Sequence, residues 1–389
     1  MPAQVLQGTL ILPDRLLNDG QIVVEEGIIQ EVVEADRGYD STLDFGDSFI
    51  APGFIDLHVH GIAGVDTMDG SQESLSLMAE RFAAHGVTGF LPTTMTASLE
   101  ATTQAIGQVH AAMSEQKPHV PSRARILGAH LEGPWISPQF KGAQNESFVT
   151  LPEEASVRAI LDAAEGALRI VTLAPEMPGA DLAIRRLLQE SVWISIGHSG
   201  ATYEQALQAI DLGASHITHC FNAMTGLNHR NPGVAGAALM SGDVFAELIA
   251  DGLHVHPDVM RLLIRVKGRE RVMLITDSMS ASERPDGRYD LGGQEVVVRG
   301  GEARLHDGTL AGSTLVMDQG LRNLIHLCRM PLVDAVYMAS STPAMAIGMG
   351  TTKGKIRTGY DADLTIMDAQ LLPQAIMIDG NVFLIDAPG

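Results

Sequence analysis

The sequence has few cysteines and no long apolar run. Its 389 residues include only Cys220 and Cys328, which leaves no CxxC pair and no disulfide framework. No apolar run is long enough to span a bilayer, and the first residues lack a basic stretch followed by an apolar one. We therefore expect a soluble protein of the reducing cytoplasm.

Positive charge is also scarce. There are 26 Lys and Arg against 47 Asp and Glu, so the formal net charge is -21. This balance argues against nucleic acid or an anionic membrane as a partner. It also means that an anionic substrate would need positive charge supplied locally at its site.

Several catalytic motifs are missing. The sequence contains no GxSxG nucleophile elbow, no Walker-type phosphate loop and no HExxH pair. A serine hydrolase with a nucleophile elbow is therefore disfavoured. No GxGxxG follows the first apolar strand of the central region, which disfavours a doubly wound dinucleotide-binding sheet, the main alternative fold.

What is present is an alternation of short apolar runs and helical stretches between residues 53 and 349. Near-continuous apolar strands alternating with helices indicate a parallel sheet covered by helices, and eight units predict a (β/α)₈ barrel. A β-hairpin insertion is expected near 286–312. Residues 1–52 and 350–389 are rich in short β-strands and predict one small β-sandwich domain built from both termini. The eight apolar runs are 53–60, 88–94, 126–133, 169–176, 192–199, 215–222, 244–252 and 272–278.

Imidazoles and carboxylates stand at the ends of these runs, where barrel enzymes carry their chemistry. A histidine or carboxylate at one strand end is usually structural, but so many suitable groups on one rim are an improbable coincidence. Imidazole and carboxylate suit Zn²⁺, Fe²⁺ and related ions, held singly with an open position or as a pair bridged by a carboxylate. The candidates are His58, His60, Glu132, His198, His219 and Asp277, with His254 just past the seventh run.

Hydrolysis is the chemistry that such a site supports. A bound metal lowers the pKa of water, and an adjacent carboxylate takes the proton and passes it to the leaving group. Asp277 is the best candidate for this general base and acid, while the metal or His254 would polarise the scissile carbonyl. His130 and His216 are expected to be buried hydrogen-bonding residues. Asp56 would lie behind the metal histidines or have a structural role.

The segments GFIDLHVHG, HLEGPW, GHSGA, THCFNAM, HRNPGVAG, IADGLHVH, LITDSM and GTLAGSTLVM, taken together, resemble the N-acetylglucosamine-6-phosphate deacetylases of the amidohydrolase superfamily. The resemblance implies a metal bound by Glu132, His198 and His219 with water. It allows a second ion at His58 and His60, with Glu132 between the ions and Asp277 contributing. Zn²⁺ is the first expectation for one or two ions per subunit, with Fe, Mn or Co as alternatives.

The same resemblance implies the substrate contacts. Arg230, with His229 and the backbone at Asn222 and Ala223, would hold the phosphate, and the arginine would reach the neighbouring subunit's site in a homodimer. His254 would orient the acetyl carbonyl. The remaining residues expected to line the sugar are Ala143, Gln144, Leu310, Ala311 and Gly312.

The implied reaction is hydrolysis of the acetamide of N-acetyl-D-glucosamine 6-phosphate to D-glucosamine 6-phosphate and acetate, in amino-sugar catabolism and cell-wall recycling. Another amidohydrolase, such as a cyclic-amide hydrolase or an N-acyl amino acid deacylase, is the enzymatic alternative. A barrel kept as a non-catalytic binding protein is the alternative from another class, and the full set of ligands argues against it.

Overall fold

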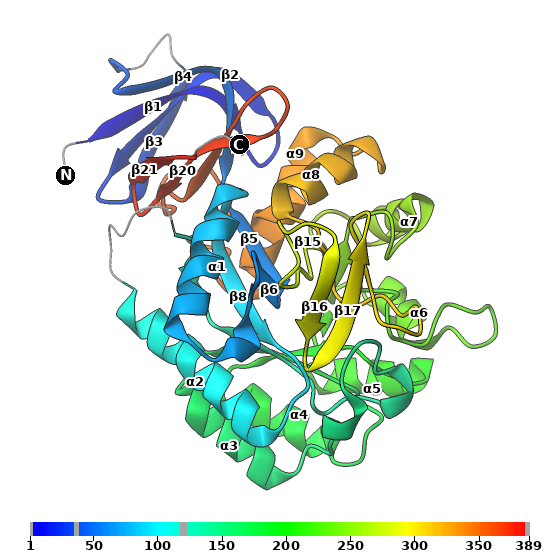
Figure 1. Cartoon of the computed structure of the whole chain (residues 1–389). Helices are drawn as coiled ribbons and strands as arrows, with labels where there is room; N and C mark the ends of the chain where they lie inside the picture. The colour runs from blue at the N-terminus through cyan, green and yellow to red at the C-terminus, as the bar shows by residue number, and fades with distance from the viewer. Residues whose placement is uncertain (1–2, 35–38, 117–122, 386–389) are drawn as a thin grey trace.

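The computed structural model describes residues 3–34, 39–116 and 123–385. Its centre is a parallel sheet of eight strands in the order β15-β14-β13-β12-β11-β10-β8-β5, with β9 (Arg125–Ile126) paired to β8 (Figure 1). Each of the eight predicted apolar runs overlaps one of these strands, and β8 and β11 begin one residue before their runs. They are β5 (Phe54–Val59), β8 (Val87–Thr94), β10 (Ala129–Glu132), β11 (Leu168–Leu173), β12 (Trp193–Ile196), β13 (His216–Ile217), β14 (Phe245–Ile249) and β15 (Val272–Ile275).

The sheet closes where β5 meets the segment that follows β15. Val59 and Ser278 form a parallel bridge, and the Asp277 N–H donates to the His58 carbonyl at 2.9 Å. The His60 N–H donates to the Ser278 carbonyl at 2.8 Å. This closure confirms the (β/α)₈ barrel, and it brings His58, His60 and Asp277 together through backbone hydrogen bonds.

Helices surround the barrel strands (Figure 1). Several begin at side-chain caps, such as Ser71, which accepts from the Ser74 N–H, and Thr202, which forms a reciprocal capping box with Gln205. The helices are α1 (Gln72–Ala84), α2 (Leu99–Glu115), α3 (Glu154–Ala164), α4 (Ala180–Gln189), α5 (Tyr203–Leu212), α6 (Gly233–Met240), α7 (Pro257–Lys267), α8 (Met317–His326), α9 (Leu332–Ala339) and α10 (Ser341–Ala346), with short 3₁₀ turns η2 (Thr67–Asp69), η3 (Pro138–Phe140) and η4 (Glu146–Phe148).

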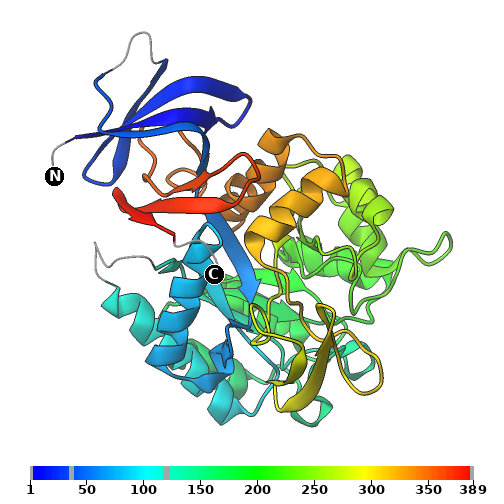
Figure 2. The same ribbon diagram turned by 45° about the horizontal axis from the view of Figure 1, so that its top comes forward.

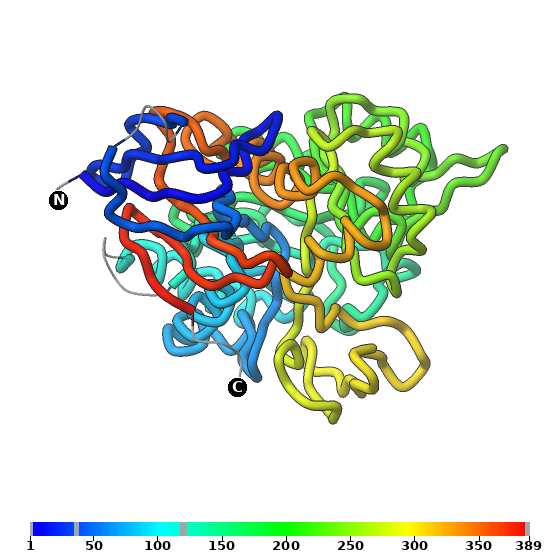
Figure 3. The backbone as a smooth tube through the Cα atoms, turned by 90° about the horizontal axis from the view of Figure 1, so that it is seen from above, coloured from blue at the N-terminus to red at the C-terminus, as the bar shows by residue number. Residues whose placement is uncertain are grey.

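A second sheet combines strands from the two ends of the described chain. β4 pairs in parallel with β1 and antiparallel with β19, so residues near 50 lie beside residues near 365 (Figures 2 and 3). The seven strands form one continuous sheet around a shared apolar cluster that includes Leu6, Ile50 and Ile366. They are β1 (Gln4–Ile11), β2 (Leu16–Glu25), β3 (Ile28–Glu34), β4 (Leu43–Pro52), β19 (Leu364–Met367), β20 (Pro373–Ile378) and β21 (Asn381–Leu384).

The insertion after β15 differs from the expected hairpin. It is a three-stranded antiparallel sheet of β16 (Gly287–Leu291), β17 (Gln294–Arg299) and β18 (Glu302–Arg304). The third strand is short and follows a Gly300-Gly301 turn in which both glycines have positive φ. A second short pair, β6 (Gly61–Ile62) and β7 (Val65–Asp66), follows β5. Among the described residues, no helix is long and apolar enough to cross a membrane.

Candidate metal centre

Glu132, His198 and His219 converge at the carboxyl ends of β10, β12 and β13. The Glu132 Oε1 lies 3.1 Å from Nε2 of His198 and 3.1 Å from Nε2 of His219. The two imidazole nitrogens are themselves 3.1 Å apart. A tetrahedral ion with bonds of about 2.0 Å holds its ligand atoms roughly 3.3 Å apart, so these three atoms fit a divalent metal with little adjustment.

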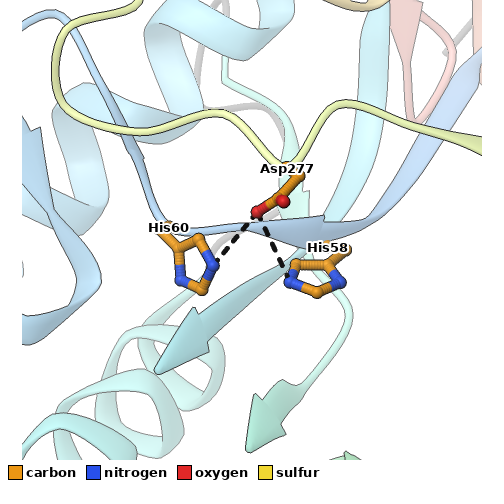
Figure 4. A group of neighbouring side chains, drawn as sticks. All are labelled: His58, His60 and Asp277. Atoms are coloured by element: carbon orange, nitrogen blue, oxygen red, sulfur yellow. Dashed lines mark ion pairs between the residues drawn. The ribbon is translucent and has the colours of Figure 1, made fainter. Parts of the chain in front are cut away.

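His58, His60 and Asp277 form a second group against the first. Figure 4 shows both rings turned toward the Asp277 carboxylate, whose Oδ1 lies 3.6 Å from Nε2 of His58 and 3.2 Å from Nε2 of His60. The Glu132 carboxylate separates the two groups, with Oε1 3.4 Å from Nε2 of His58 and Oε2 3.3 Å from Nε2 of His60. The donor set therefore fits one ion in each group, with Glu132 between them.

The backbone at these positions is unusual. His198, His219 and Asp277 have φ values of 48°, 25° and 51°, in the left-handed region that residues with a side chain rarely adopt. Gly197, just before His198, has no room for a side chain, because a Cβ there would lie 2.6 Å from Cβ of Thr218. Each of the three residues thus follows its strand through a sharp change of direction, after which His198 and His219 contact Glu132 and Asp277 contacts His58 and His60.

Burial and charge oppose each other in this centre. Burial alone would lower the pKa of His58, but the carboxylates of Glu132, Glu247 and Asp277 raise it well above its usual value. Burial alone would raise the pKa of Asp277, but His58 and His60 lower it to about 2. Ionised carboxylates packed against imidazoles suit a site in which a dication takes the place of protons.

A cavity of about 480 Å³ opens above the two groups. His60, Glu132, His198, His219 and Asp277 reach its wall, as do most of the residues expected to contact substrate. The predicted contacts on the wall are Ala143, Gln144, Asn222, Ala223, His254, Leu310 and Gly312.

Three predicted substrate residues do not line the cavity. Ala311 is buried behind it. His229 and Arg230 are exposed in the segment before α6, which projects from the barrel on the side away from the terminal sheet (Figures 1 and 3). Within one subunit, the structure therefore does not bring Arg230 to the metal centre.

Gln144 has a contact beyond the one expected. Its Nε2 donates to Oε2 of Glu132 at 2.7 Å, while its Oε1 accepts from the Thr96 N–H at 2.7 Å. Gln144 therefore touches a predicted metal ligand as well as the cavity. The expected buried roles of His130 and His216 agree with their full burial, and Asp56 accepts from the Thr276 hydroxyl at 2.6 Å.

Sequence reasoning missed two carboxylates. Asp251 Oδ2 lies 2.6 Å from Nδ1 of His254, and the spacing of three residues in DGLH is the signal that could have revealed it. Glu247 Oε2 lies 3.0 Å from Nδ1 of His58. Its signal is a charged residue in the middle of the apolar strand β14, where burial of an unpaired carboxylate is costly. Lys141, also missed, is the one Lys or Arg among the described residues that line the cavity.

Comparison with known proteins agrees with this geometry. The model of the amidohydrolase family matches residues 49–384. The chain is 39% identical to an N-acetylgalactosamine-6-phosphate deacetylase of Escherichia coli O157:H7, over 96% of this chain and 97% of that protein. It is 40% identical to an N-acetylglucosamine-6-phosphate deacetylase of Lysinibacillus sphaericus, over 89% and 88%.

A solved structure from Mycobacterium smegmatis is also similar. It is a mutant N-acetyl-D-glucosamine-6-phosphate deacetylase in complex with N-acetyl-D-glucosamine-6-phosphate. It superposes with a TM-score of 0.92 at 33% identity, and the match covers 98% of this chain and 99% of that one.

Proposed function

Because the chain belongs to the amidohydrolase family, we propose that it hydrolyses the acetamide of N-acetyl-D-glucosamine 6-phosphate to D-glucosamine 6-phosphate and acetate. One observation carries the proposal: Glu132 lies between two groups of ligands on the wall of a cavity of about 480 Å³. The names of the similar deacetylases support the substrate.

The chemistry follows from the position of each group. A bound divalent ion lowers the pKa of water and polarises a carbonyl. Asp277, whose carboxylate lies beside His58 and His60 on the cavity wall, accepts the proton of the attacking water. His254 reaches the cavity wall and hydrogen-bonds the acetyl oxygen. When the carbon–nitrogen bond breaks, Asp277 returns the proton to the departing amine, so a C–O bond replaces the C–N bond.

We propose two ions per subunit, with Zn²⁺ the first candidate and Fe²⁺, Mn²⁺ or Co²⁺ as alternatives. Glu132, His198 and His219 would hold one ion, and His58, His60 and Asp277 the other. The support is the fit of both ligand groups, including the presence of both His58 and His60. Elemental analysis of the purified protein identifies the metal and its ratio to protein.

The substrate phosphate needs positive charge that a chain of net charge -21 does not offer in general. We propose that Lys141 contributes within the subunit, and that Arg230, with His229, comes from the partner subunit of a homodimer. The exposure of Arg230 in a projecting segment supports this arrangement. The guanidinium group of an arginine can donate two parallel hydrogen bonds to the oxygens of a phosphate.

Two inactive variants test the shared site. Arg230→Ala removes the arginine, and Asp277→Asn removes the general base. In a mixed dimer the Arg230→Ala chain keeps Asp277 and receives Arg230 from its partner, which restores one of the two sites. Random mixing after dissociation makes half of the dimers mixed, and each mixed dimer has one working site of two. The mixture should therefore recover about a quarter of the parent activity. If the mixture is no more active than the two variants separately, Arg230 does not act across an interface.

Acetate release tests the reaction itself. Metal-loaded protein should release acetate from N-acetyl-D-glucosamine 6-phosphate and far less from unphosphorylated N-acetyl-D-glucosamine. N-acetyl-D-galactosamine 6-phosphate is the second candidate, because a relative at 39% identity carries that name. No acetate from either sugar phosphate would contradict the proposal, and activity on cyclic amides or N-acyl amino acids would favour another amidohydrolase reaction.

We further propose a cytoplasmic location and a role in amino-sugar catabolism and cell-wall recycling. We also propose two domains, the barrel of residues 53–349 and the small domain of residues 1–52 and 350–389. An apolar cluster made up only of residues from the small domain supports this division. Fractionation of cells and limited proteolysis are the corresponding measurements.

A further inference from the structure

Glu247 is a buried carboxylate to which the reaction as proposed gives no role. It lies in the middle of β14, with apolar neighbours along the strand. Its Oε2 is 3.0 Å from Nδ1 of His58 and also accepts from the His219 N–H at 3.0 Å. One oxygen atom therefore contacts one residue from each of the two ligand groups.

The contact with His58 determines where that ring carries its proton. A carboxylate only accepts hydrogen bonds when it is ionised, so Nδ1 of His58 must be the protonated nitrogen. When a metal ion takes the place of the second ring proton, the lone pair that binds it is then on Nε2. That atom is buried, and within the described residues it has no hydrogen-bond partner. It faces Glu132 and Asp277, where the second ion would bind.

The contact with His219 acts on the backbone. His219 has a φ of 25°, and its N–H points back toward β14. An unpaired buried N–H would cost about 1–3 kcal/mol, so its acceptor helps to hold this turn. Glu247 thus stabilises the direction of the His219 side chain from behind the strand.

A third possible ion position, among His58, His130 and Glu247, is not supported by these contacts. His130 already uses both ring nitrogens, with Nδ1 3.0 Å from the Leu57 carbonyl oxygen and Nε2 2.8 Å from the Thr172 hydroxyl. Its ring therefore offers no free nitrogen. Glu247 faces Nδ1 of His58, the ring nitrogen on the side away from the proposed second ion. We therefore assign no ion to Glu247 itself.

We propose that Glu247 is a positioning residue for the second ion: it fixes the tautomer and orientation of His58 and presents Nε2 to the metal. The inference rests on the proposed two-ion site. A carboxylate behind a metal-bound histidine raises the basicity of that ligand, and its loss typically weakens metal binding about 10- to 100-fold.

Glu247→Gln is the informative variant, because it keeps the shape and one acceptor oxygen but removes the charge. Glu283→Gln is its matched control. Glu283 also contacts a histidine, with Oε1 2.7 Å from Nε2 of His85, but it lies outside the metal centre. Glu247→Asp keeps the negative charge but shortens the side chain by one methylene, which moves the carboxylate away from His58. It provides a second test if the glutamine variant does not fold.

The assay titrates metal-free protein with Co²⁺ and follows its absorption bands without any sugar present. We expect two Co²⁺ per parent chain. In Glu247→Gln and Glu247→Asp the weaker Co²⁺ should lose about 10- to 100-fold in affinity, while the first changes by less than about twofold. In the two Glu247 variants, the ¹⁵N chemical shifts of the His58 ring should move away from the values typical of the tautomer that is protonated at Nδ1. Glu283→Gln should bind as the parent does, even if it melts at a lower temperature.

Two results would overturn the inference: unchanged Co²⁺ affinities in both Glu247 variants, or a parent that binds only one Co²⁺. Because the assay contains no sugar, its outcome is separate from the substrate question. A protein that binds two Co²⁺ but releases no acetate would contradict the proposed reaction and leave the role of Glu247 standing.

Discussion

Replacing Asp251 with asparagine should slow the reaction while leaving substrate binding almost intact. Asp251 Oδ2 lies 2.6 Å from Nδ1 of His254, and Oδ1 accepts from the backbone N–H groups of Leu253 and His254 at 2.8 and 2.9 Å. The two side chains are only 10% and 7% exposed, so solvent screens their interaction weakly. Asp251 thereby fixes the ring of His254, which is a residue of the cavity wall.

The size of the effect follows from the type of bond. A hydrogen bond to a charged group contributes about 1.5–3 kcal/mol, which corresponds to roughly 10- to 100-fold in rate if the contact is needed only in the transition state. The amide of Asp251→Asn can still accept from the two backbone N–H groups, so the loop should keep its shape. We therefore expect kcat to fall by that factor and KM to change little.

The same segment supplies a matched control. His256 and Asp258 form a similar pair, with Nδ1 3.7 Å from Oδ2, but their side chains are 71% and 63% exposed. Asp258→Asn should leave kcat and KM within about twofold of the parent, because exposed pairs contribute little. Initial rates of acetate release over a range of substrate concentrations give both constants. If Asp251→Asn behaves like Asp258→Asn, Asp251 does not act through His254.

Other predictions concern stability. Burial alone would lower the pKa of His85, but hydrogen bonds to Asp318 and Glu283 raise it to about 9. This value is above the unfolded one of about 6.5, so the stabilisation is complete below pH ~6.5 and is lost as the pH rises through ~9. Urea unfolding at pH 6.5 and 9.5 should show a loss of about 2–3 kcal/mol that His85→Gln lacks, and equal losses in both proteins would refute it. Leu131→Ala, next to Glu132 in the buried strand β10, should lower the free energy of unfolding by about 2–5 kcal/mol, whereas an exposed site such as Leu182→Ala should cost far less. Removing divalent ions with a chelator should lower the melting temperature. Zn²⁺ added at 100 times its dissociation constant should restore about 2.7 kcal/mol of unfolding free energy. A melting temperature that does not change when metal is removed or added would contradict the ion site.

The barrel could be predicted because its signal repeats. Each parallel strand is buried on both faces and reads as an apolar run, and the ligands follow these runs at the same end. The spacing of His58 and His60 predicts them as candidate ligands, and the position of Glu132 and Asp277 at the ends of apolar runs predicts these two. The third strand of the insertion was missed because Glu302–Arg304 is too short to show a period.

Contacts between side chains distant in sequence could not be predicted in the same way. Glu247 and His58 are 189 residues apart, and only closure of the barrel makes them neighbours. A single carboxylate within an apolar strand signals that a partner must exist, but it does not identify that partner. Arg230 presents a further limit, because it lies exposed and away from the cavity within one subunit, and sequence patterns do not show how subunits assemble.

The closure of the barrel has a consequence for synthesis of the protein. The first and last strands meet at the hydrogen bonds between Asp277 and His58, and these two residues also belong to the second ligand group. A growing chain that has not yet emerged beyond residue 277 lacks both this closing contact and the proposed general base. Ligand groups that depend on such distant contacts form late in folding, when long loops have already been ordered. On the proposed mechanism, a truncated or half-folded chain would therefore not hydrolyse substrate, and uptake of the proposed second ion would report that the ring of strands is complete.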